Sequence, residues 1–247
     1  MALAGQHVIV AGGSSGIGLA VASAVLAAGG RVTIVGRSRE RLARAREQLG
    51  GAERMLGGAE RICTASADIS VETDVVGMFD AAGEFDHLVT TAVDAAYQPV
   101  TEMELDEAQR VLRSKLVGAL LLAKHATRGI RPNGSLIFTS GIAAYRPSRG
   151  GAVVAAANGA LASLGRALAI ELAPIRVNVV SPGWVDTPVW EAVAGSRKEA
   201  VLASMAERLP VGRVGKTTDL APAYTFLMES EYTTGSIVHV DGGHRLV

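Results

Sequence analysis

The stretch Val8 to Ala20, VIVAGGSSGIGLA, predicts a buried strand, a glycine-rich turn and the start of a helix, in that order. The run Val8 to Val10 is β-branched, and apolar residues then recur at helical spacing from Leu19 to Val25. Glycines let the chain turn tightly and let backbone N–H groups approach a pyrophosphate at the positive end of a helix. We interpret the stretch as a phosphate-binding loop, the alternative being a turn that binds nothing. Its candidate binding residues are Gly12, Ser14, Ser15, Gly16, Ile17 and Gly18.

Length and composition favour one large domain over residues 1–247, because no linker-like tract divides the chain. Lys plus Arg and Asp plus Glu are 24 each, so no net charge attracts nucleic acid or an anionic membrane. Apolar runs are interrupted before membrane-spanning length, and the N-terminus lacks a signal-peptide pattern. The single Cys63 cannot form an internal disulfide, and its strand-like setting predicts a buried thiol. We expect a cytoplasmic protein without nucleic-acid or membrane partners, and no metal site, because the histidines lack ligand spacing.

The residues after the second predicted strand, Arg31 to Val35, indicate which dinucleotide would bind. A carboxylate there would accept from a ribose 2′-hydroxyl, but the sequence gives Arg37 and Arg39. Two guanidinium groups suit a 2′-phosphate, which favours NADP(H) over NAD(H). Alternatively, both arginines belong to the solvated face of the following helix.

The spacing Gly12-x-x-x-Gly16-x-Gly18 resembles the nucleotide loop of the short-chain dehydrogenase/reductase family. Three further segments resemble that family: Arg166 to Leu172, the Pro-Gly element Ser181 to Pro188, and the tail Thr234 to Gly243. The resemblance covers nearly the whole chain. It implies an α/β doubly wound Rossmann fold, a single domain with a mainly parallel seven-stranded sheet.

The same resemblance implies further cofactor contacts. Asp68 would lie by the adenine ring, although it could instead cap the next helix. The family's Asn-Asn-Ala-Gly element matches only at Ala92, and Val93 cannot take the positive φ open to glycine. A substrate lid would span about residues 184–210. The cofactor-contact residues implied here are Asp68, Ile69, Ala92, Pro182, Gly183, Val185 and Thr187.

The catalytic residues depart from the family pattern. Ser140 falls on the family's catalytic serine, but Val154 and Asn158 stand where the resemblance places the Tyr and Lys of Tyr-x-x-x-Lys. Lys115 stands in turn where the family has an Asn. We hypothesise that Lys115 supplies, with Asn158 as its partner, the charge that the family's Lys supplies; alternatively Lys115 extends to solvent. Tyr145 is a candidate proton donor.

Tyr97 is a second candidate donor, and either tyrosine could instead simply pack at the rim. The resemblance predicts an NADP(H)-dependent oxidoreductase that acts on an unknown carbonyl or alcohol through a non-standard proton donor. The alternatives are a catalytically silent NADP(H)-binding sensor or partner subunit, and a non-redox isomerase or lyase. The small-residue face of Gly151 to Ala162 and the last strand predict a dimer or tetramer.

Overall fold

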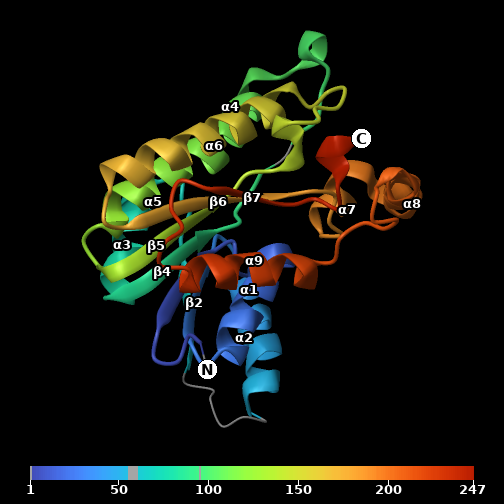
Figure 1. The fold of residues 1–247 in the computed structure, drawn as a ribbon. Coiled ribbons are helices and arrows are strands. Elements are labelled where there is room, and N and C mark those ends of the chain that lie inside the picture. Colours follow the sequence, from blue (N-terminus) through green and yellow to red (C-terminus); the bar gives the residue numbers. More distant parts are fainter. Residues whose placement is uncertain (1, 55–60, 95) are drawn as a thin grey trace.

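In a computed structural model, which describes residues 2–54, 61–94 and 96–247, seven parallel strands form one sheet in the order β3-β2-β1-β4-β5-β6-β7 (Figure 1). Buried β-branched and leucine side chains dominate the central strands, as expected for a sheet covered on both faces. The strands are β1 (His7–Ala11), β2 (Arg31–Gly36), β3 (Ile62–Ser66), β4 (Phe85–Thr90), β5 (Ile130–Thr139), β6 (Arg176–Pro182) and β7 (Ile237–Val240).

Helices cover both faces of the sheet (Figure 1). Helices α1, α2 and α9 enclose one apolar core, and α3, α5 and α6 enclose the other. The helices are α1 (Gly16–Ala27), α2 (Arg39–Arg54), α3 (Glu72–Ala82), α4 (Leu105–Leu112), α5 (Gly118–Ala126), α6 (Ala152–Glu171), α7 (Val189–Ala194), α8 (Lys198–Arg208) and α9 (Thr217–Glu229). The doubly wound fold predicted from the sequence is therefore confirmed, and the sheet is wholly parallel.

The strand order reverses between β1 and β4, which pair in the middle of the sheet. Connections from these two strands leave toward opposite sides, so their carboxyl ends flank a crevice. The β1–α1 loop, the segment after β4 and the loop after β5 all lie at this edge. The fold thus gathers the segments that the sequence marks as functional.

Apolar residues at helical spacing predict one long helix from Glu104 to Arg128, but the helix is interrupted in the structure. Helices α4 and α5 are joined by a π-helical turn, Arg113–Val117, which contains Lys115. Such turns insert one residue into the helical repeat and frequently occur at functional sites. Lys115 lies within this turn and is buried.

Two other expectations were wrong. Cys63 is exposed, because β3 is the edge strand of the sheet. The expectation that apolar runs end before membrane-spanning length was also wrong. Helix α6 is long and apolar enough to span a membrane by length and composition, with a mean hydropathy of 1.5. However, its Leu161 and Leu168 are buried in the core beside α3 and α5, the pattern of a helix packed on a sheet.

Candidate active site

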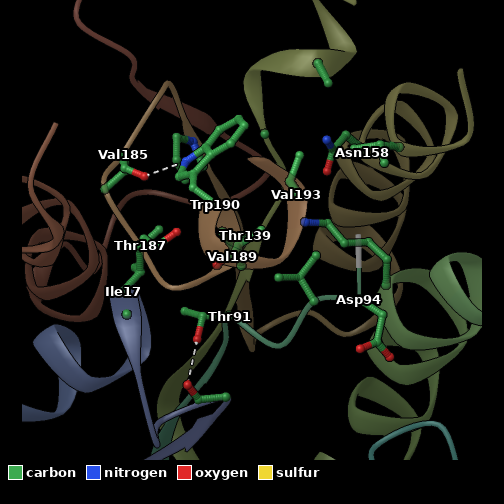
Figure 2. Close-up of a pocket in the computed structure, with 18 of the residues that line it drawn as sticks. Ile17, Thr91, Asp94, Thr139, Asn158, Val185, Thr187, Val189, Trp190 and Val193 are labelled. Atoms are coloured by element: carbon green, nitrogen blue, oxygen red, sulfur yellow. Dashed lines mark hydrogen bonds between the residues drawn. The ribbon is translucent and has the colours of Figure 1, made fainter. Parts of the chain in front are cut away.

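A cleft of about 1110 Å³ opens at the carboxyl edge of the sheet, and its wall includes every candidate residue named from the sequence except Gly18 and Arg39; Figure 2 shows part of this wall. Segments separated by more than a hundred residues therefore meet in one place. The candidates on the wall are Gly12, Ser14, Ser15, Gly16, Ile17, Arg37, Asp68, Ile69, Ala92, Lys115, Ser140, Tyr145, Asn158, Pro182, Gly183, Val185 and Thr187.

The phosphate end of the cleft is the start of α1. Ser15 is the N-cap residue and makes no side-chain capping bond, and the first turn contains no acidic residue. The first N–H groups of a helix have no partner within the helix, so here they remain available to an anion. The cleft wall at this point fits a diphosphate.

Gly18 acts beneath the loop and does not line the cleft. A Cβ atom on Gly18 would lie 2.3 Å from the Gly12 carbonyl oxygen and 2.5 Å from Thr91 Oγ1. Gly12 itself has a φ of +87°, which L side chains rarely adopt. These glycines let α1 approach β1 and β4 closely, so Gly18 shapes the loop from beneath.

Thr91 holds the glycine loop from the side of β4. Its hydroxyl lies 3.3 Å from the Gly12 carbonyl oxygen, and Figure 2 shows this side chain pointing at the loop. Val93 is 37% exposed and avoids positive φ, as its side chain requires. Thr91, Ala92 and Val93 therefore still line the cleft, and the Thr91 hydroxyl contacts the loop carbonyl.

Arg37 is paired with a carboxylate that the sequence did not single out. Its guanidinium binds both oxygens of Asp94 at 2.9 and 3.1 Å, and this hydrogen bonding raises the pKa of Arg37. Arg110 also lies 3.6 Å from Asp94. Arg41 lines the cleft beside Arg37, whereas Arg39 is not among the lining residues. The second cation at this end is therefore Arg41.

Asp68 lines the cleft and does not cap α3, whose N-cap residue is Val71. Its carboxylate accepts hydrogen bonds from the Ser70 backbone N–H and hydroxyl at 2.9 and 2.8 Å. The capping alternative is thereby corrected, because these local bonds form a turn before the helix begins.

Lys115, Ser140 and Asn158 meet in the interior of the cleft. Lys115 Nζ donates to the Ser140 carbonyl oxygen at 3.1 Å, and the Ser140 hydroxyl donates to the Asn158 carbonyl oxygen at 2.9 Å. Asn158 Oδ1 is buried without a hydrogen-bond partner among the described residues. Lys115 and Asn158 thus share the cleft as predicted, but the bond of Lys115 goes to Ser140 and not to Asn158.

Burial changes the acidity of Lys115. The residue is only 9% exposed and forms no ion pair within the part of the chain that the structure describes. Desolvation disfavours the ammonium form and lowers the pKa of Lys115 to about 8. The alternative that Lys115 extends to solvent is therefore wrong. A lysine with this pKa can exchange a proton near neutral pH.

The other candidate proton donors lie nearer the rim. Tyr145 is 39% exposed and packs edge-on against His239, with ring centroids 4.8 Å apart. Tyr97 is 37% exposed, and burial raises the pKa of its hydroxyl. Val154 lines the cleft from α6 but carries no proton. Among these groups, Lys115 is the most enclosed.

The lid side of the cleft begins at the Pro-Gly element after β6. Val185 pairs with Gly215 in an isolated bridge, and its carbonyl oxygen accepts from Trp190 Nε1 at 2.9 Å (Figure 2). Trp184 and Trp190 stack with centroids 4.2 Å apart. These contacts fix α7 over the cleft next to Thr187.

Residues missed by sequence reasoning also line the cleft: Arg41, Asp94, Arg146, Arg149, Arg197, Arg208 and His244. None belongs to a motif, so only their position at the ends of strands or on the lid could have indicated them. Asp94 was the easiest of these residues to predict, because it follows β4 at the sheet edge, three residues after Thr91.

The residues present fit a pyridine dinucleotide. Among the described residues, no side chain caps the start of α1, Arg37 and Arg41 line the cleft after β2, and the Pro-Gly element lines the cleft after β6. Gly12, Ser14, Ser15, Gly16 and Ile17 would hold the diphosphate.

Comparison with known proteins agrees with this geometry. Residues 11–245 match the family model described as enoyl-(acyl carrier protein) reductase. The chain is 32% identical to the short-chain dehydrogenase/reductase ucsE of Acremonium sp., over 96% of this chain and 94% of that one.

Two solved structures are closely similar. The reductase/Diels-Alderase MalC of Malbranchea aurantiaca is 30% identical, with a TM-score of 0.90 over 100% of this chain and 98% of that chain. The NADPH-bound short-chain oxidoreductase of Pseudomonas aeruginosa PAO1, described as containing an atypical catalytic center, is 28% identical, with a TM-score of 0.89 over 98% and 97% of the two chains. The dinucleotide cleft, the wholly parallel sheet and these matches together place the chain in the short-chain dehydrogenase/reductase family of NAD(P)H-binding oxidoreductases.

Proposed function

We propose that this protein is an NADP(H)-dependent oxidoreductase that reduces a carbonyl group, with Lys115 as the proton donor. One observation carries the proposal: the Lys115 ammonium group is buried in the cleft beside Ser140 and has no carboxylate partner among the described residues. By the family resemblance, Val154 and Asn158 stand where a Tyr and a Lys would act, so another group must supply the proton.

The bound dinucleotide would supply a hydride to the carbonyl carbon. Negative charge then develops on the substrate oxygen, and a nearby cation stabilises it. Lys115 Nζ has three donors and uses one of them on the Ser140 carbonyl. A second can hydrogen-bond the substrate oxygen and transfer its proton, which leaves a neutral amine that regains a proton from water.

Ser140 and Asn158 position Lys115 in this scheme. The Ser140 hydroxyl donates to the Asn158 carbonyl, so it must leave that bond before it can donate to a substrate. Its carbonyl instead fixes the Lys115 amine. The unpaired Asn158 Oδ1 is free to accept a hydrogen bond from a ligand or from a reoriented Lys115.

We propose NADP(H) over NAD(H) because Arg37 and Arg41 line the cleft after β2 and no carboxylate follows that strand directly. The Pseudomonas neighbour, whose structure contains NADPH, is consistent with this preference. A small-molecule carbonyl compound fits the size of the cleft.

The test is NADPH absorbance with a panel of ketones, quinones and imines, using wild-type protein, K115M and K124M. Lys124 is an exposed lysine on α5, and K124M is the matched control. We expect stoichiometric NADPH oxidation by wild type and K124M and a loss of about a hundredfold or more in K115M, the usual contribution of general acid catalysis. Bound NADPH that no panel member oxidises, or full activity of K115M, would overturn the proposal.

We also propose a homo-oligomer, a dimer or tetramer, in a reducing cytoplasm. Supporting the oligomer, Leu105 and Leu120 on the α4–α5 helices are 64% and 44% exposed, beside the small-residue face of α6. Light scattering on the purified protein measures the mass, and a monomer at micromolar concentration would contradict the proposal.

A further inference from the structure

The outer part of the cleft carries four arginines whose guanidinium groups pair with nothing among the described residues. They lie on the loop after β5, at the start of α8 and at its end. The four are Arg146, Arg149, Arg197 and Arg208. In contrast, Lys198 on α8 contacts Asp186 at 2.8 Å, and Arg213, just after the lid, binds both oxygens of Asp219.

No carboxylate of the described residues balances this charge on the cleft wall. The two acidic residues that line the cleft, Asp68 and Asp94, both act on Arg37 at the opposite end. The outer cleft therefore presents uncompensated positive charge to whatever enters it.

His244 provides a second, independent observation. His244 is 7% exposed and lines the cleft. Its Nδ1 atom is buried without a hydrogen-bond partner in the described part of the chain. Burial, together with the charges of Arg146 and Arg208, lowers the pKa of His244, so both arginines act on this side chain. Asp241 has the opposite effect on His244, but its oxygens already accept from the Gly243 and Arg245 backbone N–H groups. Arg146, Arg208 and His244 thus form a polar cluster with unused hydrogen-bonding capacity.

The neighbouring wall is apolar. Trp184 and Trp190 stack in parallel, with an interplanar angle of 11°. Val189 and Val193 on α7, labelled in Figure 2, and Met205 on α8 also line this part of the cleft. Such a wall suits a flat hydrocarbon body.

We propose that the substrate is a carbonyl compound with an apolar body and an oxyanion group, and that Arg146, Arg208 and His244 bind the oxyanion. Guanidinium groups bind carboxylate and phosphate oxygens through paired N–H donors, and His244, whose Nδ1 has no hydrogen-bond partner among the described residues, lines the cleft with them. The inference that the anion is a substrate rests on the proposed function. The inference that this cluster binds an anion does not.

Binding is tested by calorimetry with 2-naphthoate and its uncharged analogue 2-naphthamide, with and without NADPH. Three proteins are compared: wild type, the double variant R146Q/R208Q, and R128Q as the control. Arg128 is exposed and lies outside the cleft, so R128Q serves as the charge-changing control away from the proposed site.

We expect wild type and R128Q to bind the naphthoate about tenfold more tightly than the amide, as charge-assisted bonds predict, and R146Q/R208Q to lose most of that preference. Equal affinity of wild type for the two probes would overturn the proposal, and so would a preference that R146Q/R208Q retains.

Turnover is tested with 4-acetylbenzoate and its methyl ester, which share the same ketone. We expect a higher kcat/KM for the acid in wild type and R128Q, and similar values for the two compounds in R146Q/R208Q. If the protein binds 2-naphthoate more tightly than 2-naphthamide but no carbonyl compound oxidises NADPH, the proposed function is rejected and the anion site is still supported. If NADPH is oxidised with a higher kcat/KM for the methyl ester than for the acid, the anion site is rejected and the reductase function is still supported.

Discussion

At Lys115, burial of an ammonium group opposes stability. Its pKa is lowered from 10.5 to about 8 in the folded protein, so folding at neutral pH includes the cost of desolvating a charge. That cost is present in full below pH 8 and disappears as the pH rises from 8 to 10.5. We predict that K115M raises the free energy of unfolding at pH 7 by up to about 3 kcal/mol, a gain that shrinks at alkaline pH. Urea unfolding at several pH values measures it.

Lys124 provides the control for that experiment, because its side chain is 62% exposed and pairs with Glu72 on the surface. K124M is expected to change stability by less than about 1 kcal/mol, independently of alkaline pH. A K115M protein that is less stable than wild type at pH 7 would contradict the account of Lys115 as a costly buried charge.

The pair Arg37–Asp94 opposes the binding of a 2′-phosphate, because Asp94 accepts hydrogen bonds from both terminal nitrogens of Arg37 and places a negative charge beside it. We predict that D94N, which keeps the shape and removes the charge, tightens NADPH binding about three- to tenfold and leaves NADH binding unchanged. Fluorescence titration measures both constants. E40Q removes an equivalent charge outside the cleft wall and is expected to alter neither.

Residue types predicted most of the cleft, but pairings between distant residues were not predictable. Lys115 and Asn158 were correctly placed in one site, whereas the bond from Lys115 to the Ser140 carbonyl depends on side-chain direction within a π-helical turn. The pairing of Arg37 with Asp94 joins residues 57 positions apart. Sequence periodicity carries no information on such contacts.

At the level of elements, the β1–α1 turn depends on the missing side chain of Gly18. A Cβ there would meet backbone atoms of Gly12, which cannot move without displacing the diphosphate loop. We predict that G18A weakens NADPH binding by at least about tenfold, since backbone approach to the diphosphate is lost. Calorimetry measures the affinity.

Gly77 in α3 provides the opposite case, because a Cβ there would meet nothing within 4 Å. G77A should leave cofactor affinity unchanged and stabilise the protein by about 0.5–1 kcal/mol, the usual gain from alanine in a helix. Unchanged NADPH affinity in G18A would show that the close approach of α1 is not required for binding.

Element boundaries show where sequence patterns fail. Apolar spacing predicts the helix from Glu104 to Arg128 but cannot detect a π turn, because one inserted residue barely changes the periodicity. Cys63 lies in a correctly predicted strand, yet its exposure depends on the position of β3 at the sheet edge. Neighbouring strands decide burial, and sequence order does not give strand order.

For the whole molecule, buried neutral histidines predict sensitivity to acid. His87 lies between Ser135 and Gln6 at 2.9 Å from each, and burial lowers its pKa to about 4. Below pH 6.5 the unfolded chain takes up a proton that the folded chain refuses, so stability falls as the pH drops from 6.5 toward 4.

We predict that His87 accounts for up to about 3 kcal/mol of this loss and that H87L, although less stable at pH 7, loses correspondingly less on acidification. Thermal unfolding between pH 7 and pH 4 measures the difference. The lowered pKa values of His7, His239 and His244 act in the same direction, so only the difference between wild type and H87L isolates His87. Parallel curves for the two proteins would contradict the assignment.

The overall architecture was predictable because strands and helices alternate with clear apolar patterns and the glycine loop marks the first crossover. Right-handed crossovers then leave few possible topologies. The arginine-rich outer cleft was not predictable, because its members come from the loop after β5 and from the lid, where no periodic pattern applies.

The proposed role of Lys115 as the proton donor is tested most directly by the pH dependence of NADPH-driven carbonyl reduction. A donor with a pKa of about 8 must be protonated to act, so kcat should fall as the pH rises through 8, with a single break. K115M should be slow and lack that break. A wild-type rate that stays constant from pH 7 to 9, or a break that persists in K115M, would contradict the account.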